Sequence, residues 1–140
     1  QNLKREGDRR VKNIIRMSIP SSLENLSLIR ALVKTYLEVQ HINEKDIFQL
    51  LSVVDELSTN VVEHGYKYKP GDIILEIQKS NDIIQLIVED NGIGFDEEKL
   101  SKEEGGMGLY IARAIADNFK IEKKLNGTLF KIEKRIKEAV

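Results

Sequence analysis

Apolar residues recur along this chain with two different periods, which predicts strands and helices in turn. Near the start they alternate with polar residues, which predicts a strand that ends at Pro20, with one face made of Val11, Ile15, Met17 and Ile19. Between 21 and 39, and again between 46 and 64, they recur every three to four positions, which indicates two amphipathic helices. The apolar stripes are Leu26, Ile29, Val33 and Tyr36 in the first helix, and Ile47, Leu50, Leu51, Val54, Leu57 and Val61 in the second.

Each of these helices has a candidate start signal. Ser21 and Glu24 stand three positions apart, as in a capping box, where each side chain binds the other residue's backbone N–H. Asn43 precedes the second helix, and its side chain can accept a hydrogen bond from one of the unpaired N–H groups there.

Two hairpins are predicted in the second half of the chain. Residues 73–79 and 83–90 alternate around Asn81-Asp82, with an apolar face made of Ile73, Leu75, Ile77, Ile84, Leu86 and Val88. Residues 120–136 alternate around Asn126-Gly127, a dipeptide typical of two-residue hairpin turns. Between the hairpins a glycine-rich loop precedes a shorter helix, predicted at 109–119.

The predicted strands each have one apolar and one largely polar face, which indicates an α/β two-layer sandwich. We expect a single five-stranded sheet, mixed and mostly antiparallel, with three helices on one face. The elements follow in the order β-α-α-β-β-loop-α-β-β. The other face of the sheet, with Glu76, Gln78 and Gln85, should meet water or a partner.

Length and composition narrow the class of protein. The 140 residues fit one domain, here 11–140, after a polar tail at 1–10 that does not resemble a signal peptide. With 22 basic and 23 acidic residues, neither nucleic acid nor an anionic membrane is expected as the main partner. No stretch approaches the roughly 20 apolar residues of a spanning helix. The absence of cysteine excludes disulfides and thiolate chemistry, and fits a cytoplasmic location.

Glu56, Asn60 and His64 stand four positions apart, so they should stack on one side of the second helix. They could be the solvated face of an amphipathic helix. Alternatively, the carboxylate is a proton acceptor, and the amide oxygen of Asn60 a ligand for a hard cation such as Mg²⁺.

Two glycine-rich stretches also suggest chemistry. In "VEDNGIGF", a tight turn at Asn91-Gly92 would need a strand directly afterwards, and none follows. Asp90 instead ends a buried strand, where a carboxylate needs a donor such as the amine of a base. The glycines Gly105, Gly106 and Gly108 precede a helix, and form either a flexible linker or a phosphate site. This stretch matches neither a Walker A loop nor a dinucleotide fingerprint.

Taken together and in order, these motifs resemble a known superfamily. ExxxN on a helix, DxGxG after a strand, GxG before a helix and a final "NGT" are similar to the nucleotide-binding boxes of the gyrase, Hsp90, histidine-kinase and MutL ATPases, which share the Bergerat-type ATP-binding fold. The resemblance covers about 19–136. The short lid at 95–104, "DELSTNVVEHGY" and "EGGMGLYIARAIAD" look most like bacterial anti-sigma-factor serine/threonine kinases of the partner-switching type.

The resemblance implies ATP and Mg²⁺ as cofactors and a role for each motif residue. Glu56 would be the general base, Asn60 would hold Mg²⁺, and Asp90 would bind the adenine amine. His64 matches a histidine that is frequent in this branch. The remaining nucleotide-binding residues would be Gly92 and Gly94 under the adenine, Thr128 beside it, and Gly105, Gly106, Met107, Gly108 and Leu109 at the phosphates.

The resemblance further implies a kinase that phosphorylates a small antagonist protein, sequesters a sigma factor and forms a homodimer. Glu103 and Glu104 stand where some members carry a basic residue that reaches the γ-phosphate, so Lys99 and Lys102 are the cations of the lid. This departure concerns the efficiency of transfer more than nucleotide binding. Two alternatives stay open: a non-catalytic ATP-binding module and the catalytic domain of a histidine kinase.

Overall fold

The computed structural model describes residues 14–92 and 109–137. The polar tail, the lid and the last three residues therefore lie outside the described residues. In chain order the elements are β1 (Ile15–Pro20), the short 3₁₀ helix η1 (Leu23–Asn25), α2 (Leu26–Val39), α3 (Glu44–Asn60), the π-helical turn η2 (Val61–Gly65), β2 (Asp72–Ser80), β3 (Ile83–Asp90), α5 (Tyr110–Ile115), β4 (Asn118–Lys124) and β5 (Gly127–Arg135).

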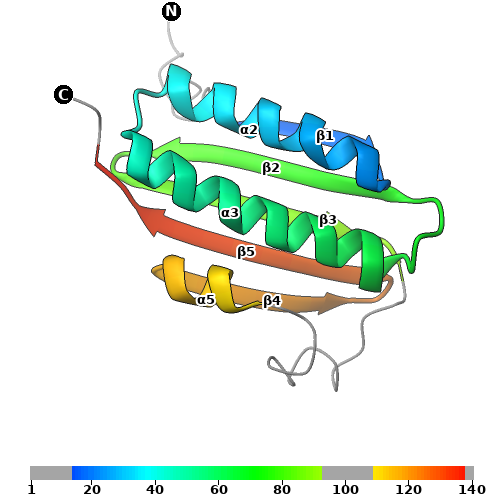
Figure 1. The fold of residues 1–140 in the computed structure, drawn as a ribbon. Helices are drawn as coiled ribbons and strands as arrows, with labels where there is room; N and C mark the ends of the chain where they lie inside the picture. Colours follow the sequence, from blue (N-terminus) through cyan, green and yellow to red (C-terminus); the bar gives the residue numbers. More distant parts are fainter. Residues whose placement is uncertain (1–13, 93–108, 138–140) are drawn as a thin grey trace, which may run out of the picture.

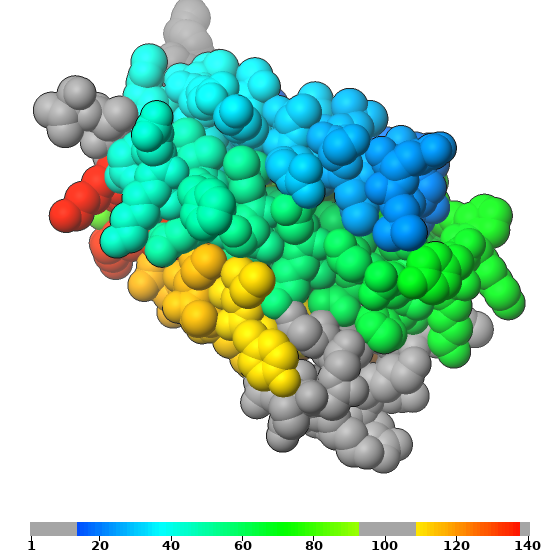
Figure 2. Space-filling model, in the orientation of Figure 1, coloured from blue at the N-terminus to red at the C-terminus, as the bar shows by residue number. Residues whose placement is uncertain are grey.

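The strands form one five-stranded sheet in the order β1-β2-β3-β5-β4. Every neighbouring pair is antiparallel, so the expectation of a mixed sheet was wrong. The three α-helices of the described residues lie on one face (Figure 1), and Figure 2 shows α2, α3 and α5 side by side across it. The predicted two-layer α/β sandwich is thus confirmed. No helix in the described ranges combines the length and apolar character needed to cross a bilayer.

The core lies between the helices and the sheet. The predicted inward residues of the first hairpin are all buried, as are Ile29, Val33 and Tyr36 of α2. Leu51 of α3 is half-buried. Ile15 differs from its prediction, since its side chain is 43% exposed. It lies on β1, one of the two edge strands of the sheet. Val11 lies outside the described residues.

The two predicted helix starts had different outcomes. Asn43 caps α3, because its side chain accepts a hydrogen bond from Asp46 N at 2.9 Å. The capping box was wrong: the Ser21 hydroxyl has no hydrogen-bond partner among the described residues. The Ser21 N–H donates instead to the Gly71 carbonyl oxygen at 2.7 Å. The 3₁₀ turn η1 intervenes before α2, so Ser21 does not stand at the start of the α-helix.

The third helix and second hairpin also differ in detail from the sequence pattern. Helix α5 is six residues long, because β4 already begins at Asn118. The hairpin turn consists of Leu125 and Asn126, and Gly127 is the first residue of β5, paired with Lys124. The predicted hairpin is present, but its turn lies one residue earlier than predicted.

One end of the molecule gathers the segments that carry the motifs. The C-terminal ends of α3 and β3 and the start of β5 all lie at this end (Figure 1). Helix α5 runs alongside α3, with its first turn nearer to the same end. Residues from four separate stretches of sequence are therefore brought close together by the sheet topology.

Candidate nucleotide site

Asp90 ends β3 opposite Thr128 of β5, and both residues are fully buried. One carboxylate oxygen, Oδ1, accepts a hydrogen bond from Gly92 N at 2.8 Å. The other, Oδ2, has no partner among the described residues, and neither has the Thr128 hydroxyl. A buried polar atom without a partner costs about 1 to 3 kcal/mol. Asp90 Oδ2 and the Thr128 hydroxyl could therefore form hydrogen bonds with a ligand that carries a hydrogen-bond donor.

The environment of Asp90 raises the pKa of its carboxyl group from 3.8 to about 6. Burial is the main cause, since it disfavours the charged form. The Gly92 N–H, the charges of Lys124 and Lys123 and, least, the backbone of Thr128 act in the opposite direction. At neutral pH the group is therefore ionised, and its open oxygen is a strong acceptor for an N–H donor.

Gly127 brings β5 close to Asp90. Its φ of +116° is in a region that side chains rarely adopt, and a Cβ there would overlap the Asp90 carbonyl oxygen. Only glycine fits both the conformation and the space. The glycine of the "NGT" motif thus allows Thr128 to lie directly beside the acid.

Gly92 is required for packing within the chain. A Cβ at this position would overlap the Gly65 carbonyl oxygen and lie 3.0 Å from the ring carbon Cδ1 of Tyr66. The turn after β3 can therefore rest against the end of η2 only if residue 92 is glycine. That Gly92 also lies under an adenine stays a prediction.

Asn60 is the last residue of α3 and is buried, with 6% of its surface exposed. It therefore does not belong to a solvated helix face. The backbone then widens into η2, where Tyr66 N donates to the Val61 carbonyl oxygen, five residues earlier. This turn holds more residues than an α-helical one. The four-residue spacing assumes an α-helix, so it does not by itself place His64 in line with Asn60 and Glu56, and the role of His64 stays a prediction. π-helical turns of this kind are frequent at functional sites.

Glu56 joins α3 to α5. Its Oε1 accepts a hydrogen bond from Ala112 N at 2.8 Å, and its Oε2 accepts one from Ile111 N at 3.1 Å. Burial raises the pKa of the Glu56 carboxyl group, and these two N–H groups oppose the rise. A carboxylate at the start of a helix satisfies N–H groups that have no partner within the helix. Glu56 thus caps α5, a contact that its sequence position did not predict.

Residues 19–133 match the family described as "Histidine kinase-like ATPase domain". The chain belongs to this family. It is 27% identical over 121 residues to "Serine-protein kinase RsbW" of Bacillus cereus and of Bacillus thuringiensis subsp. konkukian, with 76% of each chain covered. These matches confirm the resemblance inferred from the motifs, and the names of the relatives support the predicted kinase activity.

Two solved structures resemble this histidine kinase-like ATPase domain in fold. The RsbU and RsbW domains of Rv1364c from Mycobacterium tuberculosis superimpose with a TM-score of 0.71 at 21% identity. That match covers 90% of this chain, which spans about a third (33%) of the other. The SiaB–SiaC complex from Pseudomonas aeruginosa matches with a TM-score of 0.58 at 14% identity, over 98% of this chain and 99% of the other. At these identities the likeness concerns the fold.

Part of the site predicted for this ATPase domain lies outside the described residues: Gly94, Gly105, Gly106, Met107 and Gly108. Leu109 is described, and its side chain is fully buried in the core. Its backbone is therefore the part that could face a ligand. Across 14–92 and 109–137, no group of three or more His, Cys, Asp or Glu residues could hold a metal ion.

The structure adds residues to the site that the sequence reasoning did not assign. The Tyr66 hydroxyl accepts a hydrogen bond from Asn91 N at 2.8 Å. Lys124 donates to Asn91 Oδ1 at 3.0 Å and also pairs with Glu89. Tyr66 belongs to the quoted stretch "DELSTNVVEHGY", but nothing in the pattern indicated its contact. The position of Lys124 could have been inferred from the predicted second hairpin, because Lys124 pairs with Gly127 of the "NGT" motif.

Proposed function

We propose that this protein is an ATP-dependent serine/threonine kinase that phosphorylates a small antagonist protein and, in another state, sequesters a sigma factor. The relatives named serine-protein kinases support the activity. The single observation that carries the nucleotide site is the buried oxygen of Asp90 beside the Thr128 hydroxyl, neither of which has a hydrogen-bond partner within 14–92 and 109–137. Because a sigma factor works with RNA polymerase, the proposed site of action is the cytoplasm.

The chemistry at Asp90 fits adenine better than guanine. Adenine carries an exocyclic amine, which is a donor, whereas guanine carries a carbonyl oxygen at the corresponding position. The amine would complete the hydrogen bonding of Asp90 Oδ2, with Thr128 as a second polar contact. A guanine oxygen would face the carboxylate acceptor to acceptor. The proposed nucleotide is therefore ATP rather than GTP.

The proposed metal site is Asn60. Mg²⁺ binds oxygen ligands, retains several waters and is usually held by few protein groups together with phosphates. One buried amide at the end of α3 fits that requirement without a carboxylate cluster. When bound, Mg²⁺ neutralises charge on the phosphates.

Glu56 is the proposed general base, which would accept the proton of the serine or threonine hydroxyl. Both of its oxygens already accept hydrogen bonds from the first turn of α5. That observation favours a second candidate function, an ATP-binding module that sequesters its partner without transferring phosphate. The kinase requires that Glu56 accept a proton from the substrate hydroxyl while its oxygens bind the N–H groups of α5, whereas the non-catalytic module does not require it.

Incubation with Mg-ATP and the cognate antagonist tests the kinase proposal. Mass spectrometry should detect phosphoserine or phosphothreonine on the antagonist. The variant Asp55→Asn is a matched control, since Asp55 neighbours Glu56 but pairs with Arg30 on the surface of the helices. It should keep full activity. Tight antagonist binding without any phosphorylation would favour the non-catalytic module, and transfer to an isolated histidine-bearing domain would favour a histidine kinase.

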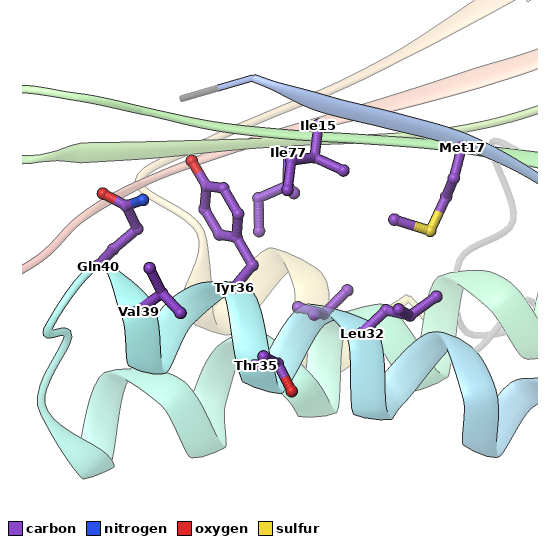
Figure 3. Close-up of a pocket in the computed structure, with 9 residues that line it drawn as sticks. Ile15, Met17, Leu32, Thr35, Tyr36, Val39, Gln40 and Ile77 are labelled. Carbon is purple, nitrogen blue, oxygen red and sulfur yellow. The ribbon is translucent and has the colours of Figure 1, made fainter. Parts of the chain in front are cut away.

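We also propose a homodimer through the α2 side of the molecule. A groove of about 280 Å³ lies between α2 and the sheet, lined mainly by apolar side chains (Figure 3). Leu32 and Val39 on α2 are 39% and 63% exposed, and Ile15 lies across from them on the edge strand β1. An apolar groove beside an edge strand is a surface that a second copy could cover.

Analytical ultracentrifugation tests the dimer. Leu32→Glu should convert the protein to a monomer, because it introduces a charge into the apolar groove. Leu125→Glu is the matched control, since Leu125 is 96% exposed at the tip of the β4–β5 hairpin. That variant should stay dimeric. A parent protein that sediments as a monomer at high concentration would rule out the dimer.

A further inference from the structure

The side chain of Tyr66 connects three segments at the nucleotide end of the molecule. Tyr66 follows η2 directly, and its hydroxyl donates to the Asp72 carbonyl oxygen of β2 at 2.7 Å. The Tyr66 hydroxyl oxygen in turn accepts a hydrogen bond from the Asn91 N–H at 2.8 Å, just after β3 ends. With both hydrogen bonds made, the hydroxyl has a defined orientation. One side chain thereby fixes the end of β3 relative to the start of β2 and the end of α3.

The ring of Tyr66 fills the space left by two glycines. A Cβ on Gly71 would overlap the ring, and a Cβ on Gly92 would lie 3.0 Å from its Cδ1. Neither neighbour can gain a side chain without displacing Tyr66. The ring is therefore held between the start of β2 and the turn after β3.

The turn at 90–92 is held from three directions. Tyr66 binds the Asn91 backbone, Lys124 of β4 binds the Asn91 side chain at 3.0 Å, and the Gly92 N–H binds Asp90 Oδ1 at 2.8 Å. These contacts engage the Asn91 N–H, the Asn91 side-chain oxygen and Asp90 Oδ1. Asp90 Oδ2 remains without a partner among the described residues. The direction of that oxygen thus depends on how firmly the Asn91 backbone is held.

We propose that Tyr66 is a positioning residue for base recognition: its hydroxyl fixes the Asn91 backbone and thereby directs Asp90 Oδ2 at the exocyclic amine of the nucleotide. The inference rests on the proposed ATP site. Tyr66 does not touch the base in this account, and acts through Asp90. A receptor that is already ordered binds more tightly than one that must be ordered by its ligand.

The test compares Tyr66→Phe with Tyr68→Phe by isothermal titration calorimetry. Tyr68 is the matched control: it lies in the same loop, is 63% exposed, and its hydroxyl interacts with Glu63 rather than with the turn. Two probes are used, Mg-ATP and Mg-tripolyphosphate, which lacks the base. Tyr66→Phe removes both hydrogen bonds of the hydroxyl, but only the one from the Asn91 N–H orders Asp90, so ATP affinity should fall about five- to tenfold, the usual effect of one lost hydrogen bond. The affinity for tripolyphosphate should stay within about twofold. Tyr68→Phe should change neither affinity.

The outcomes separate the inference from the function on which it rests. If Tyr66→Phe weakens both probes equally, or neither, Tyr66 has at most a structural role and the inference is overturned. If the parent binds no adenine nucleotide, the proposed function fails and the inference fails with it. If Tyr66→Phe does not fold, Lys124→Met tests the same turn from its other side, and an unchanged ratio of ATP to tripolyphosphate affinity there also overturns the inference.

Discussion

Replacing Asp90 by asparagine should make the protein more stable at neutral pH while it weakens nucleotide binding. The carboxylate is fully buried, and one of its oxygens has no partner among the described residues. Asparagine has nearly the same shape and carries no charge, so it escapes most of the cost of burial. The substitution should therefore raise the stability of the fold and lower the affinity for the nucleotide, which is the usual trade-off between stability and function at a binding site.

The size of the effect follows from the pKa of Asp90, which is 3.8 ordinarily and about 6 in the folded protein. Between these pH values the folded state holds a proton that the unfolded state has lost, so stability falls as pH rises. At 1.36 kcal/mol per pKa unit, the loss is about 2 to 3 kcal/mol, complete above pH 6 and absent below pH 3.8. Asp90→Asn does not titrate and should lack this loss.

Urea unfolding of parent and variant between pH 4 and pH 8 measures the effect. The difference in free energy of unfolding, variant minus parent, should increase by about 2 to 3 kcal/mol over this range. A difference that stays constant with pH would refute the reasoning, because the Asp90 carboxylate would then bear no cost of burial. Calorimetry at pH 7.5 should show ATP binding weakened about 10- to 100-fold, the effect of losing a charged hydrogen bond, whereas Asp55→Asn should bind as the parent does.

Two further predictions concern neighbouring residues. Gly127→Ala should destabilise the fold by at least about 2 kcal/mol, since it combines a strained φ with an overlap onto the Asp90 carbonyl oxygen; a melting temperature equal to the parent's would contradict this. Glu56→Ala should keep ATP affinity within a few-fold but reduce phosphate transfer at least about 100-fold, and amide exchange at Ile111 and Ala112 should accelerate. Unchanged turnover would show that another group is the base, and unchanged exchange that Glu56 does not hold α5.

Local signals in the sequence predicted the architecture well. Alternation and helical spacing depend on which side chains face the core. The core contains all the predicted inward residues of the first hairpin and those of the second helix except Leu51, which is half-buried. The Asn43 cap also succeeded, because it depends on a residue three positions away. Where an element's end is set by a distant segment, prediction failed: Ser21 binds the Gly71 backbone, and no capping box forms.

The site shows the same division. Motif spacing led to Asp90 and Thr128, which the sheet register pairs directly. The contacts that shape the site join residues far apart in the chain: Asn91 lies 25 positions from Tyr66, and Ile111 lies 55 from Glu56. Spacing within one segment carries no information about such pairs. The role of Gly92 in packing against η2 was hidden for the same reason.

The central claim is that Asp90 Oδ2 accepts a hydrogen bond from the exocyclic amine of adenine. Carbon-13 NMR of the Asp90 carboxyl group, titrated with pH in the presence of ATP, GTP or tripolyphosphate, tests it most directly. A donor bound to the carboxylate favours its charged form, so ATP should lower the pKa of Asp90 below its value of about 6, whereas tripolyphosphate and GTP should not lower it. If ATP binds and the pKa of Asp90 stays where it was, the adenine lies elsewhere and the account is contradicted.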